Sequence, residues 1–297
     1  MTVDDIKRLL VVGAGSMGSQ IAMQAALHGY AVTLNDLTPE LLERAMKGNR
    51  EQLAKRVAKG QLPQAKMDEA VGRVRLETDL ERAARDADLV IEAIIERLEP
   101  KRECFARLDR SSPPHAILAT NSSTLMISQI ADATKRPDKC ANMHWFFPPL
   151  VMRLVEVVKG KQTSEETVQV VADFTKRIGR EPVILRKELP GFLVNRILRA
   201  QAREAYYLLE EGVASFADID KAVELGLNHP MGPFKLSDFS GLDIGYNARL
   251  ETYDVTKDPK DAPPKALEAR VKRGDFGRKT GRGFYDWTTT PLTPTKE

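Results

Sequence analysis

One stretch of the chain, LLVVGAGSMGSQIAMQAALHGYAVTLND at residues 9–36, restricts the possible folds more than any other. Residues 9–12 form an apolar run typical of a buried parallel strand. Glycines follow with the spacing G-x-G-x-x-G, and a helix is predicted over 17–28 before Gly29 ends it. A second strand is predicted over 31–34, and Asp36 follows it. Together these features predict an α/β sheet that binds a dinucleotide.

Each glycine of the motif has a physical role in such a site. Gly13 permits a tight turn, Gly15 lets the backbone approach a pyrophosphate, and Gly18 lets the helix pack closely on the strand. The pyrophosphate would lie at the helix N-terminus, where the backbone at Ser16 and Met17 offers free N–H groups. The simpler interpretation is a glycine turn in an α/β sheet without a cofactor.

The acid after the second strand bears on which dinucleotide binds. Asp36 can accept hydrogen bonds from a ribose 2′-OH and would repel a 2′-phosphate, which favours NAD over NADP. An aspartate that only stabilises a turn is the alternative.

The composition is that of an ordinary globular protein long enough for two domains. The 297 residues have a formal net charge of +3, which is too balanced to predict a nucleic-acid partner. Cys104 and Cys140 lack metal-ligand spacing, so we expect no metal site and a reducing, cytoplasmic location. The apolar run near the N-terminus is short, so we expect no membrane segment.

Strands and helices alternate up to residue 188, which predicts a doubly wound, Rossmann-type sheet in a domain of residues 1–188. Ligands of such sheets bind beyond the carboxyl ends of the strands. Ala93, Glu96 and Lys101 follow a predicted strand and are expected near the cofactor groove. The later strands of this sheet are predicted over 74–77, 88–93, 116–119, 140–144, 154–158 and 182–185.

The pattern changes at the sequence ELPG, residues 188–191, and no convincing strand follows. Residues 189–297 are therefore expected to form an all-helical second domain. Asn195, early in its first helix, is expected close to the domain boundary and so to the cleft between the domains. The helices are predicted over 192–211, 218–225, 236–253 and 265–272.

His144 is suited to accept the proton of an alcohol during hydride transfer, because it ends the strand predicted over 140–144. His28, His115 and His229 lie instead at a helix end, in a loop and in a turn. Glu156 lies 12 residues after His144 inside the apolar run LVEVV, where a carboxylate needs a partner. A His144–Glu156 pair would raise the basicity of the second ring nitrogen. A purely structural pair is the alternative.

Two other polar clusters are open to more than one interpretation. The run TNSST at residues 120–124 has four hydroxyls and an amide at a strand end, which suits either a ligand or a cap for the next helix. Lys55 and Arg56 lie in a basic helical stretch. That stretch is either a solvated face or a binding site for the phosphates of a large anionic substrate.

Several segments make the sequence similar to the short-chain L-3-hydroxyacyl-CoA dehydrogenases, also called 3-hydroxybutyryl-CoA dehydrogenases. They are GAGSMGSQIA, DLVIEAIIER, TNSSTLMISQIA, MHWFFPPLVMRLVEVV, LPGFLVNRIL, NHPMGPFKLSDFSGLD and FGRKTGRGFYDW. The resemblance covers nearly the whole chain. It implies NAD-dependent interconversion of an (S)-3-hydroxyacyl-CoA and a 3-oxoacyl-CoA, in fatty acid metabolism. It also implies a homodimer formed through the helical C-terminal domain.

The resemblance further implies roles for individual residues. His144 would be the catalytic base and Glu156 its partner. Ser123 would hydrogen-bond the substrate oxygen, and Asn195 would help to place the substrate beside His144. Ser123 and Asn195 are donors of the kind that stabilise developing negative charge.

The same resemblance implies contacts to the cofactor and to the acyl-CoA. Asp36 would bind the adenine ribose. The acyl-CoA would lie in the cleft, with its phosphates near Lys55 and Arg56. The further cofactor contacts would be Ala93, Glu96, Lys101, Asn121 and Lys279.

Two positions depart from the usual family pattern. Phe147, in HWFFPP, stands where the family usually has an asparagine, so a polar contact is lost and an apolar ring is added. The order NSST also differs from the usual TSS type, so Ser122 could share the role of Ser123. One alternative function is a dehydrogenase of a non-CoA hydroxy acid, such as a sugar acid or a hydroxylated ring acid. Another is a dinucleotide-binding structural or regulatory protein without turnover.

Overall fold

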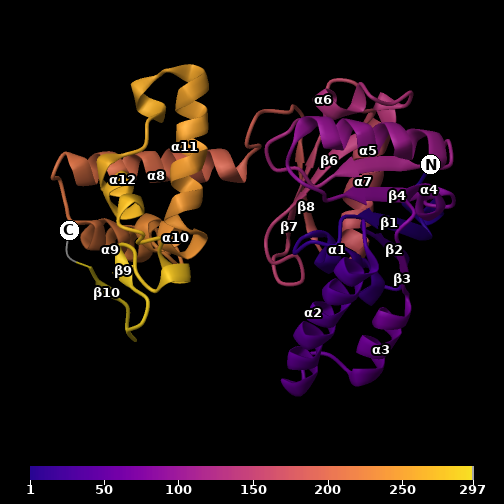
Figure 1. Ribbon diagram of the computed structural model, residues 1–297, viewed down its shortest axis with the longest axis horizontal. Helices are drawn as coiled ribbons and strands as arrows, with labels where there is room; N and C mark the ends of the chain where they lie inside the picture. Colours follow the sequence, from indigo (N-terminus) through magenta and orange to yellow (C-terminus); the bar gives the residue numbers. More distant parts are fainter. Residues whose placement is uncertain (296–297) are drawn as a thin grey trace. The chain divides into compact units, whose positions relative to one another are not determined.

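Short apolar runs rich in β-branched residues form one eight-stranded sheet (Figure 1). The computed structural model describes residues 1–295 of the chain. The central strands are buried on both faces, as strands covered by helices on both sides must be. The strands are β1 (Arg8–Val12), β2 (Ala31–Asn35), β3 (Val74–Glu77), β4 (Leu89–Glu92), β5 (Ile117–Thr120), β6 (Cys140–Trp145), β7 (Leu154–Val158) and β8 (Glu181–Leu185).

The strand order is β3-β2-β1-β4-β5-β6-β7-β8. Neighbours from β3 to β6 are parallel, whereas β7 is antiparallel to β6 and parallel to β8. The chain proceeds from β1 to β2 and β3 on one side, and continues with β4 on the other side of β1. This reversal creates a switch point between β1 and β4, where such sheets bind ligands. The predicted doubly wound, Rossmann-type sheet is confirmed.

Helices cover both faces of the sheet (Figure 1). Alternate residues of β1 point to opposite faces, so Leu9 and Val11 join one buried cluster and Leu10 and Val12 join the other. The first cluster lies under α1 (Gly18–Leu27), α2 (Pro39–Ala58), α3 (Gln64–Gly72) and α7 (Glu165–Arg177). The second lies under α4 (Leu80–Ala84), α5 (Leu98–Ser111) and α6 (Ile127–Ala131).

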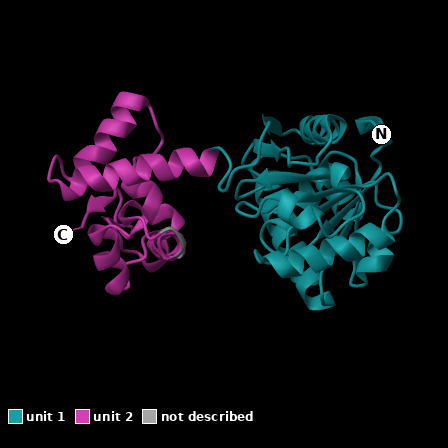
Figure 2. Ribbon diagram, turned by 90° about the horizontal axis from the view of Figure 1, so that it is seen from above, with its two compact units in different colours: residues 1–193 teal, residues 194–297 magenta. Residues whose placement is uncertain are grey.

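The chain divides into two compact units, Met1–Leu193 with the sheet and Val194–Glu297 with the remaining helices (Figure 2). The second unit has a core of packed aromatic rings, Tyr206, Phe216, Phe234 and Phe284. Its helices are α8 (Val194–Glu210), α9 (Phe216–Leu227), α10 (Pro233–Ser240), α11 (Leu242–Thr256) and α12 (Lys265–Lys272). The predicted helical C-terminal domain is confirmed.

Three details of the chain after residue 191 differ from the sequence-based predictions. The single helix predicted over 236–253 is wrong, because Gly241, with a φ of 102°, separates α10 from α11. A short antiparallel ladder of β9 (Tyr285–Asp286) and β10 (Thr293–Pro294) means that this unit is not entirely helical. The helix predicted from residue 192 begins at Val194, because Phe192 has a left-handed φ of 48°.

Candidate active site

The glycine turn between β1 and α1 contains two glycines that the fold requires and one that it does not. A Cβ on Gly13 would lie 2.6 Å from the Ala93 carbonyl oxygen, and one on Gly18 would lie 1.9 Å from the Gly13 oxygen. A Cβ on Gly15 would meet nothing within 4 Å. Because no protein contact demands a glycine at Gly15, the open space beside it fits the close approach of a dinucleotide pyrophosphate.

Asp36 connects the end of β2 to this turn. Its Oδ2 accepts a 2.6 Å hydrogen bond from the Ala14 N–H, and its Oδ1 accepts one of 2.7 Å from the Leu37 N–H. The carboxylate is half-buried and lies beside the turn that would hold the pyrophosphate. It therefore has both a structural role in the turn and a position suited to a ribose hydroxyl.

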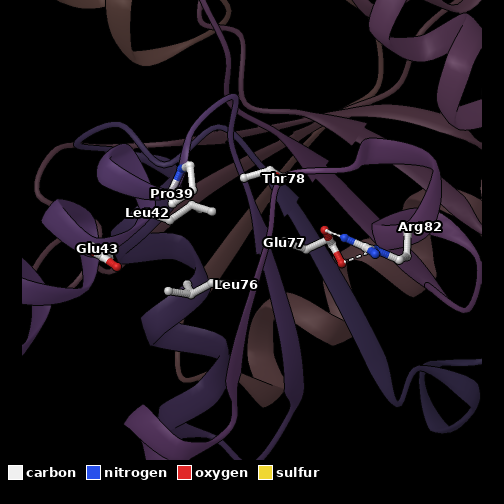
Figure 3. Close-up of a pocket in the computed structure, with 7 residues that line it drawn as sticks. All are labelled: Pro39, Leu42, Glu43, Leu76, Glu77, Thr78 and Arg82. Carbon is white, nitrogen blue, oxygen red and sulfur yellow. Dashed lines mark hydrogen bonds and ion pairs between the residues drawn. The ribbon is translucent and has the colours of Figure 1, made fainter.

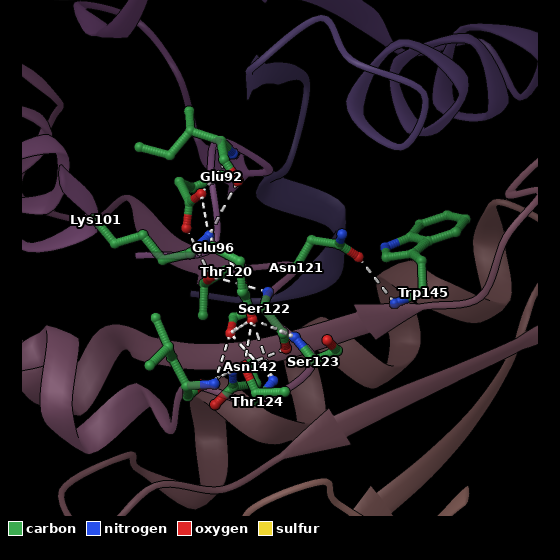
Figure 4. Close-up of polar contacts among 12 residues, drawn as sticks. Glu92, Glu96, Lys101, Thr120, Asn121, Ser122, Ser123, Thr124, Asn142 and Trp145 are labelled. Carbon is green, nitrogen blue, oxygen red and sulfur yellow. Dashed lines mark hydrogen bonds and ion pairs between the residues drawn. The ribbon is translucent and has the colours of Figure 1, made fainter. Parts of the chain in front are cut away.

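A buried ion pair lies at the carboxyl ends of β4 and β5 (Figure 4). The Lys101 ammonium is 2.6 Å from Glu92 Oε1, and both side chains are almost fully buried. The Thr120 hydroxyl donates to Glu92 Oε2 at 2.6 Å, and the Ile94 N–H donates to Oε1 at 2.6 Å. This saturated network fixes the loop that follows β4.

Glu96 connects that loop to the serine-rich turn after β5. Its Oε1 accepts from the Ser122 hydroxyl at 2.5 Å and from the Thr124 hydroxyl at 2.9 Å, and Lys101 lies 3.3 Å from Oε2 (Figure 4). Burial raises the pKa of Glu96, but the hydrogen bond from Ser122 and the charge of Lys101 outweigh it, so the pKa lies below its ordinary value of 4.5. Glu96 is therefore an ionised anchor for residues 122–124.

The two serines of this turn have different surroundings. The Ser122 hydroxyl donates to Glu96 and accepts from the Leu125 N–H at 2.8 Å. The Ser123 backbone N–H donates to Glu96 at 3.1 Å, but within residues 1–295 its hydroxyl has no hydrogen-bond partner. Asn121 binds the backbone N–H of Trp145 at 3.0 Å and so joins the turn to the end of β6. Of these two serines, Ser123 is the one whose hydroxyl is available to a ligand among the residues that the structure describes.

His144 and Glu156 lie directly opposite each other in the antiparallel ladder of β6 and β7. His144 Nδ1 is 2.7 Å from Glu156 Oε2, and both side chains are buried. An ionised carboxylate only accepts, so Nδ1 carries the proton of this bond, and a neutral ring held in this way has its lone pair on Nε2. In the described part of the chain, no residue bonds Nε2. An imidazole nitrogen with a free lone pair is chemically able to accept a proton.

The surroundings of the imidazole are aromatic. The Phe146 and Phe192 rings lie 4.6 Å and 5.6 Å from the His144 ring, measured between centroids. The next residue, Phe147, is 63% exposed, and Val151 and Met152 in the following turn are also exposed. The chain after β6 therefore presents apolar side chains to solvent close in sequence to His144.

The remaining predicted residues lie elsewhere. Asn195 is in the first turn of α8, and Lys279 is 2.5 Å from Asp243 Oδ2; both belong to the second unit. Lys55 and Arg56 are in the last turn of α2, within the first unit. The structure thus brings together Ser123, Glu96, Lys101 and Asn121 in one network and His144 and Glu156 in one pair.

A hollow of about 330 Å³ lies between the start of α2 and the end of β3 (Figure 3). None of the predicted site residues lines it. Arg82 and Glu77 on its wall form hydrogen bonds of 2.6 Å with each other, and this pair holds the pKa of Glu77 at about 2. The lining residues are Pro39, Leu42, Glu43, Leu76, Glu77, Thr78 and Arg82.

Sequence reasoning missed two residues that shape the site. Glu92 ends the apolar run of β4, and a carboxylate in an apolar strand was the same signal that identified Glu156. Phe192 gave no such signal, because its contact with His144 and its left-handed φ depend on the tertiary fold.

No helix within residues 1–295 is both long and apolar enough to cross a membrane.

Two family models together match most of the chain. The model for the 3-hydroxyacyl-CoA dehydrogenase NAD-binding domain matches residues 8–189, and the one for the 3-hydroxyacyl-CoA dehydrogenase C-terminal domain matches residues 191–287. A probable 3-hydroxybutyryl-CoA dehydrogenase of Bacillus subtilis is 42% identical over 95% of this chain and 98% of its own length. The glycine turn thus belongs to an NAD-binding domain.

Solved structures lead to the same family. The (S)-3-hydroxybutyryl-CoA dehydrogenase PaaH1 of Ralstonia eutropha is 35% identical, with a TM-score of 0.88 over 96% of this chain and all of its own. A diketoreductase with dual catalysis of dicarbonyl compounds is 36% identical, with a TM-score of 0.83 over 94% of this chain and 98% of its own. The chain belongs to the 3-hydroxyacyl-CoA dehydrogenase family and is an NAD-dependent oxidoreductase.

Proposed function

We propose that the protein oxidises an (S)-3-hydroxyacyl-CoA to the 3-oxoacyl-CoA, and catalyses the reverse reaction, with His144 as the general base. The observation that supports this most directly is the 2.7 Å bond between His144 Nδ1 and Glu156, which leaves Nε2 as the proton acceptor. In oxidation, Nε2 takes the hydroxyl proton; in reduction, it returns that proton to the ketone. Glu156 holds the ring and stabilises the imidazolium.

Ser123 and Asn195 are the proposed donors to the substrate oxygen. The free hydroxyl of Ser123, fixed through its backbone by Glu96, supports this role over Ser122. A donor that is held in place before reaction stabilises the developing alkoxide at little reorganisation cost. The role of Asn195 rests on the family resemblance, since it lies in the second unit.

The glycine turn, Asp36 and the residues at the adjacent edge of the sheet are the proposed NAD-binding residues. NAD accepts the hydride when bound. Gly13, Gly15, Gly18 and the backbone at Ser16 and Met17 would hold its pyrophosphate, and Asp36 its adenine ribose. Ala93, Glu96 and Asn121 border the same edge of the sheet. Buried Lys101 would act on the cofactor through Glu96, and Lys279 would contribute from the second unit.

A cluster of positive charge supports a binding site for the CoA phosphates. Burial, with the positive charges of Arg56 and Arg153, lowers the pKa of Arg180 to about 10. The Arg180 guanidinium donates to the Pro149 oxygen at 2.8 Å and has no acidic partner within residues 1–295. We propose that phosphates bind Arg56 of this cluster and its neighbour Lys55, and that changing both to Glu abolishes a salt-sensitive affinity for free CoA.

The decisive experiment follows NADH oxidation with acetoacetyl-CoA, beside free acetoacetate and NADPH as controls. We expect turnover only with the thioester and NADH, and we expect His144→Gln to lower kcat by about 10²–10⁴-fold without loss of NADH binding. Undiminished turnover by His144→Gln would show that another group is the base.

Phe147 favours a second candidate, a dehydrogenase of a non-CoA hydroxy acid. The exposed ring adds apolar surface where the family usually has an amide, and the related diketoreductase is described as acting on dicarbonyl compounds. Turnover of free hydroxy acids but of no thioester would select this candidate. Phe147→Asn should then restore activity on acetoacetyl-CoA.

We also propose a homodimer formed through the second unit. Large apolar side chains are exposed on several of its helices, among them Ile197 and Tyr207 on α8, Leu225 on α9 and Ile244 on α11. Ile197→Glu should give a monomer in sedimentation equilibrium, whereas Val183→Glu in the first unit should not.

We also propose that the protein works in a reducing compartment, the cytoplasm, because the thiols of Cys104 and Cys140 are free and buried.

A further inference from the structure

The last residues of the first unit lie directly against the proposed catalytic pair. The Leu193 backbone N–H donates to Glu156 Oε1 at 3.1 Å, while Oε2 of the same carboxylate binds His144. The Phe192 ring is 1% exposed, and its centroid is 5.6 Å from that of the imidazole. Leu193 therefore contacts Glu156, and its neighbour Phe192 contacts His144.

The backbone of this segment is held in a conformation that its sequence disfavours. Phe192 has a φ of 48°, next to Gly191 with a φ of 77°, and the Phe192 N–H donates to the Leu189 oxygen at 2.9 Å. A bulky side chain rarely adopts the left-handed region, and such a conformation persists only where the surrounding structure determines it. The contacts with Glu156 and His144 are those that would be lost if Phe192 relaxed.

A second anchor fixes the other end of the segment. Glu188 is buried, and its Oε2 accepts a 3.2 Å hydrogen bond from the Ser128 N–H in the first turn of α6. The chain from Glu188 to Leu193 is thus attached to the first unit at both ends. Its path over the imidazole is set by these two hydrogen bonds and by the packing of Phe192.

We propose that Phe192 is a positioning residue of the reaction. Its left-handed backbone aims the Leu193 N–H at Glu156, and its ring keeps His144 from tilting away from Glu156 and excludes water from their bond. Nε2 then points consistently at the substrate. This inference rests on the proposed roles of His144 and Glu156, because a well-positioned pair matters only if the pair performs the chemistry.

The test compares Phe192→Leu and Phe192→Gly with Phe105→Leu. Phe105 is a matched control, because it is also fully buried in the first unit but packs in the cluster under α5. Glycine adopts the left-handed φ without strain, so Phe192→Gly removes the ring and keeps the backbone path. The measurements are steady-state kinetics with acetoacetyl-CoA and NADH, and the proton NMR signal of the His144 Nδ1–H, assigned by its loss in His144→Gln.

We expect both Phe192 variants to lower kcat by about tenfold or more, since small displacements of a catalytic group are costly, with KM for NADH changed by less than about twofold. Their Nδ1–H signal should broaden by exchange with water, while Phe105→Leu retains both the signal and kcat. Normal kcat in the Phe192 variants would overturn the inference, as would losses that match those of Phe105→Leu. If His144→Gln remains active, it is the proposed function that fails.

Discussion

Each unit of the molecule contains more than one fully buried carboxylate, and two of them, Asp238 in the second unit and Glu156 in the first, are used differently. Asp238 in the second unit accepts from the backbone N–H groups of Phe284 at 2.9 Å and Tyr285 at 2.8 Å, and from the Trp287 indole at 3.0 Å. Glu156 in the first unit accepts from the Leu193 N–H and from a histidine side chain. Both carboxylates are 0% exposed, so burial alone does not distinguish them.

The difference lies in whether the groups that donate to each carboxylate can themselves transfer a proton. The partners of Asp238 are two backbone N–H groups and an indole N–H, which do not transfer protons, so this carboxylate only connects segments of the chain. Burial raises the pKa of Asp238, although the backbone donors lower it. The main partner of Glu156 is an imidazole whose second nitrogen is open. A buried acid is thus evidence of catalysis only where its partner can pass a proton onward.

Neutralising each carboxylate in turn tests this difference most directly. An amide at Glu156 can donate to Nδ1 and so move the ring proton to Nε2, where the base needs its lone pair. We expect Glu156→Gln to lower kcat by about 10²–10⁴-fold with NADH binding retained. Steady-state NADH oxidation and fluorescence titration with NADH measure the two quantities.

Asp238→Asn is the matched variant in the other unit. Its amide would face N–H donors, so we expect the free energy of unfolding to fall by about 1–3 kcal/mol while kcat changes little. Urea unfolding, together with the same kinetic assay, tests this. A folded Asp238→Asn protein that is as inactive as Glu156→Gln would show that the distinction drawn from their partners is wrong.

The two serines of the serine-rich turn differ in the same way. We expect Ser123→Ala to lower kcat by about 10²-fold, because it removes a positioned donor to the developing oxyanion. Ser122→Ala leaves the Leu125 N–H without its acceptor and should lower stability by about 1–2 kcal/mol, with a much smaller change in kcat. Equal kinetic losses in the two variants would mean that both hydroxyls contact the substrate.

Alanine substitutions of Gly15 and Gly18 distinguish a loss of ligand contact from a loss of packing in the glycine turn. Gly15→Ala places a methyl group in open space, so the protein should fold normally and bind NADH about tenfold more weakly, or about 1.4 kcal/mol. Gly18→Ala places its methyl group against the Gly13 oxygen and should destabilise the fold by about 1–3 kcal/mol. Isothermal titration with NADH and thermal unfolding test the two arms. Unchanged NADH affinity in Gly15→Ala would place the pyrophosphate elsewhere.

What the sequence could predict depended on local pattern. Residues 9–36 combine a buried run, three spaced glycines and an acid, so their fold follows from short-range rules. His144 and Glu156 were predictable as a pair, because a polar residue in each of two successive strands implies a partner across a turn. In both cases the evidence lies within a few dozen residues.

What the sequence could not predict depended on distant contacts. Lys101 was expected beside the cofactor, but its burial against Glu92 requires the packing of α5 on the sheet. Gly241 lies in a helical pattern, where one glycine costs only about 1 kcal/mol, so the break between α10 and α11 was not evident. The left-handed Phe192 follows from its tertiary contacts alone.

The smallest expected effect concerns Glu96, whose carboxylate anchors the turn that carries Ser123. Its pKa is lowered in the folded state, so its contribution to stability is fully present above 4.5 and is lost as the pH falls through the lower folded-state value. Because the side chain is 39% exposed, the contribution is only about 0.5 kcal/mol after screening by solvent. Glu96→Gln should therefore be slightly less stable than the wild type at neutral pH and equally stable in acid, as measured by urea unfolding.

Glu77→Gln is the matched control, because Glu77 also has a lowered pKa, of about 2, but it ends β3, four strands along the sheet from the β5 strand that the serine-rich turn follows. Both variants should lose the same kind of pH dependence, since each loses an acid that is ionised more easily when folded. Only Glu96→Gln should also lower kcat, by about threefold to tenfold, because only there does the carboxylate hold the Ser123 backbone. If Glu77→Gln lowers kcat to the same degree, then the charge of the sheet edge, and not the position of Ser123, explains the effect.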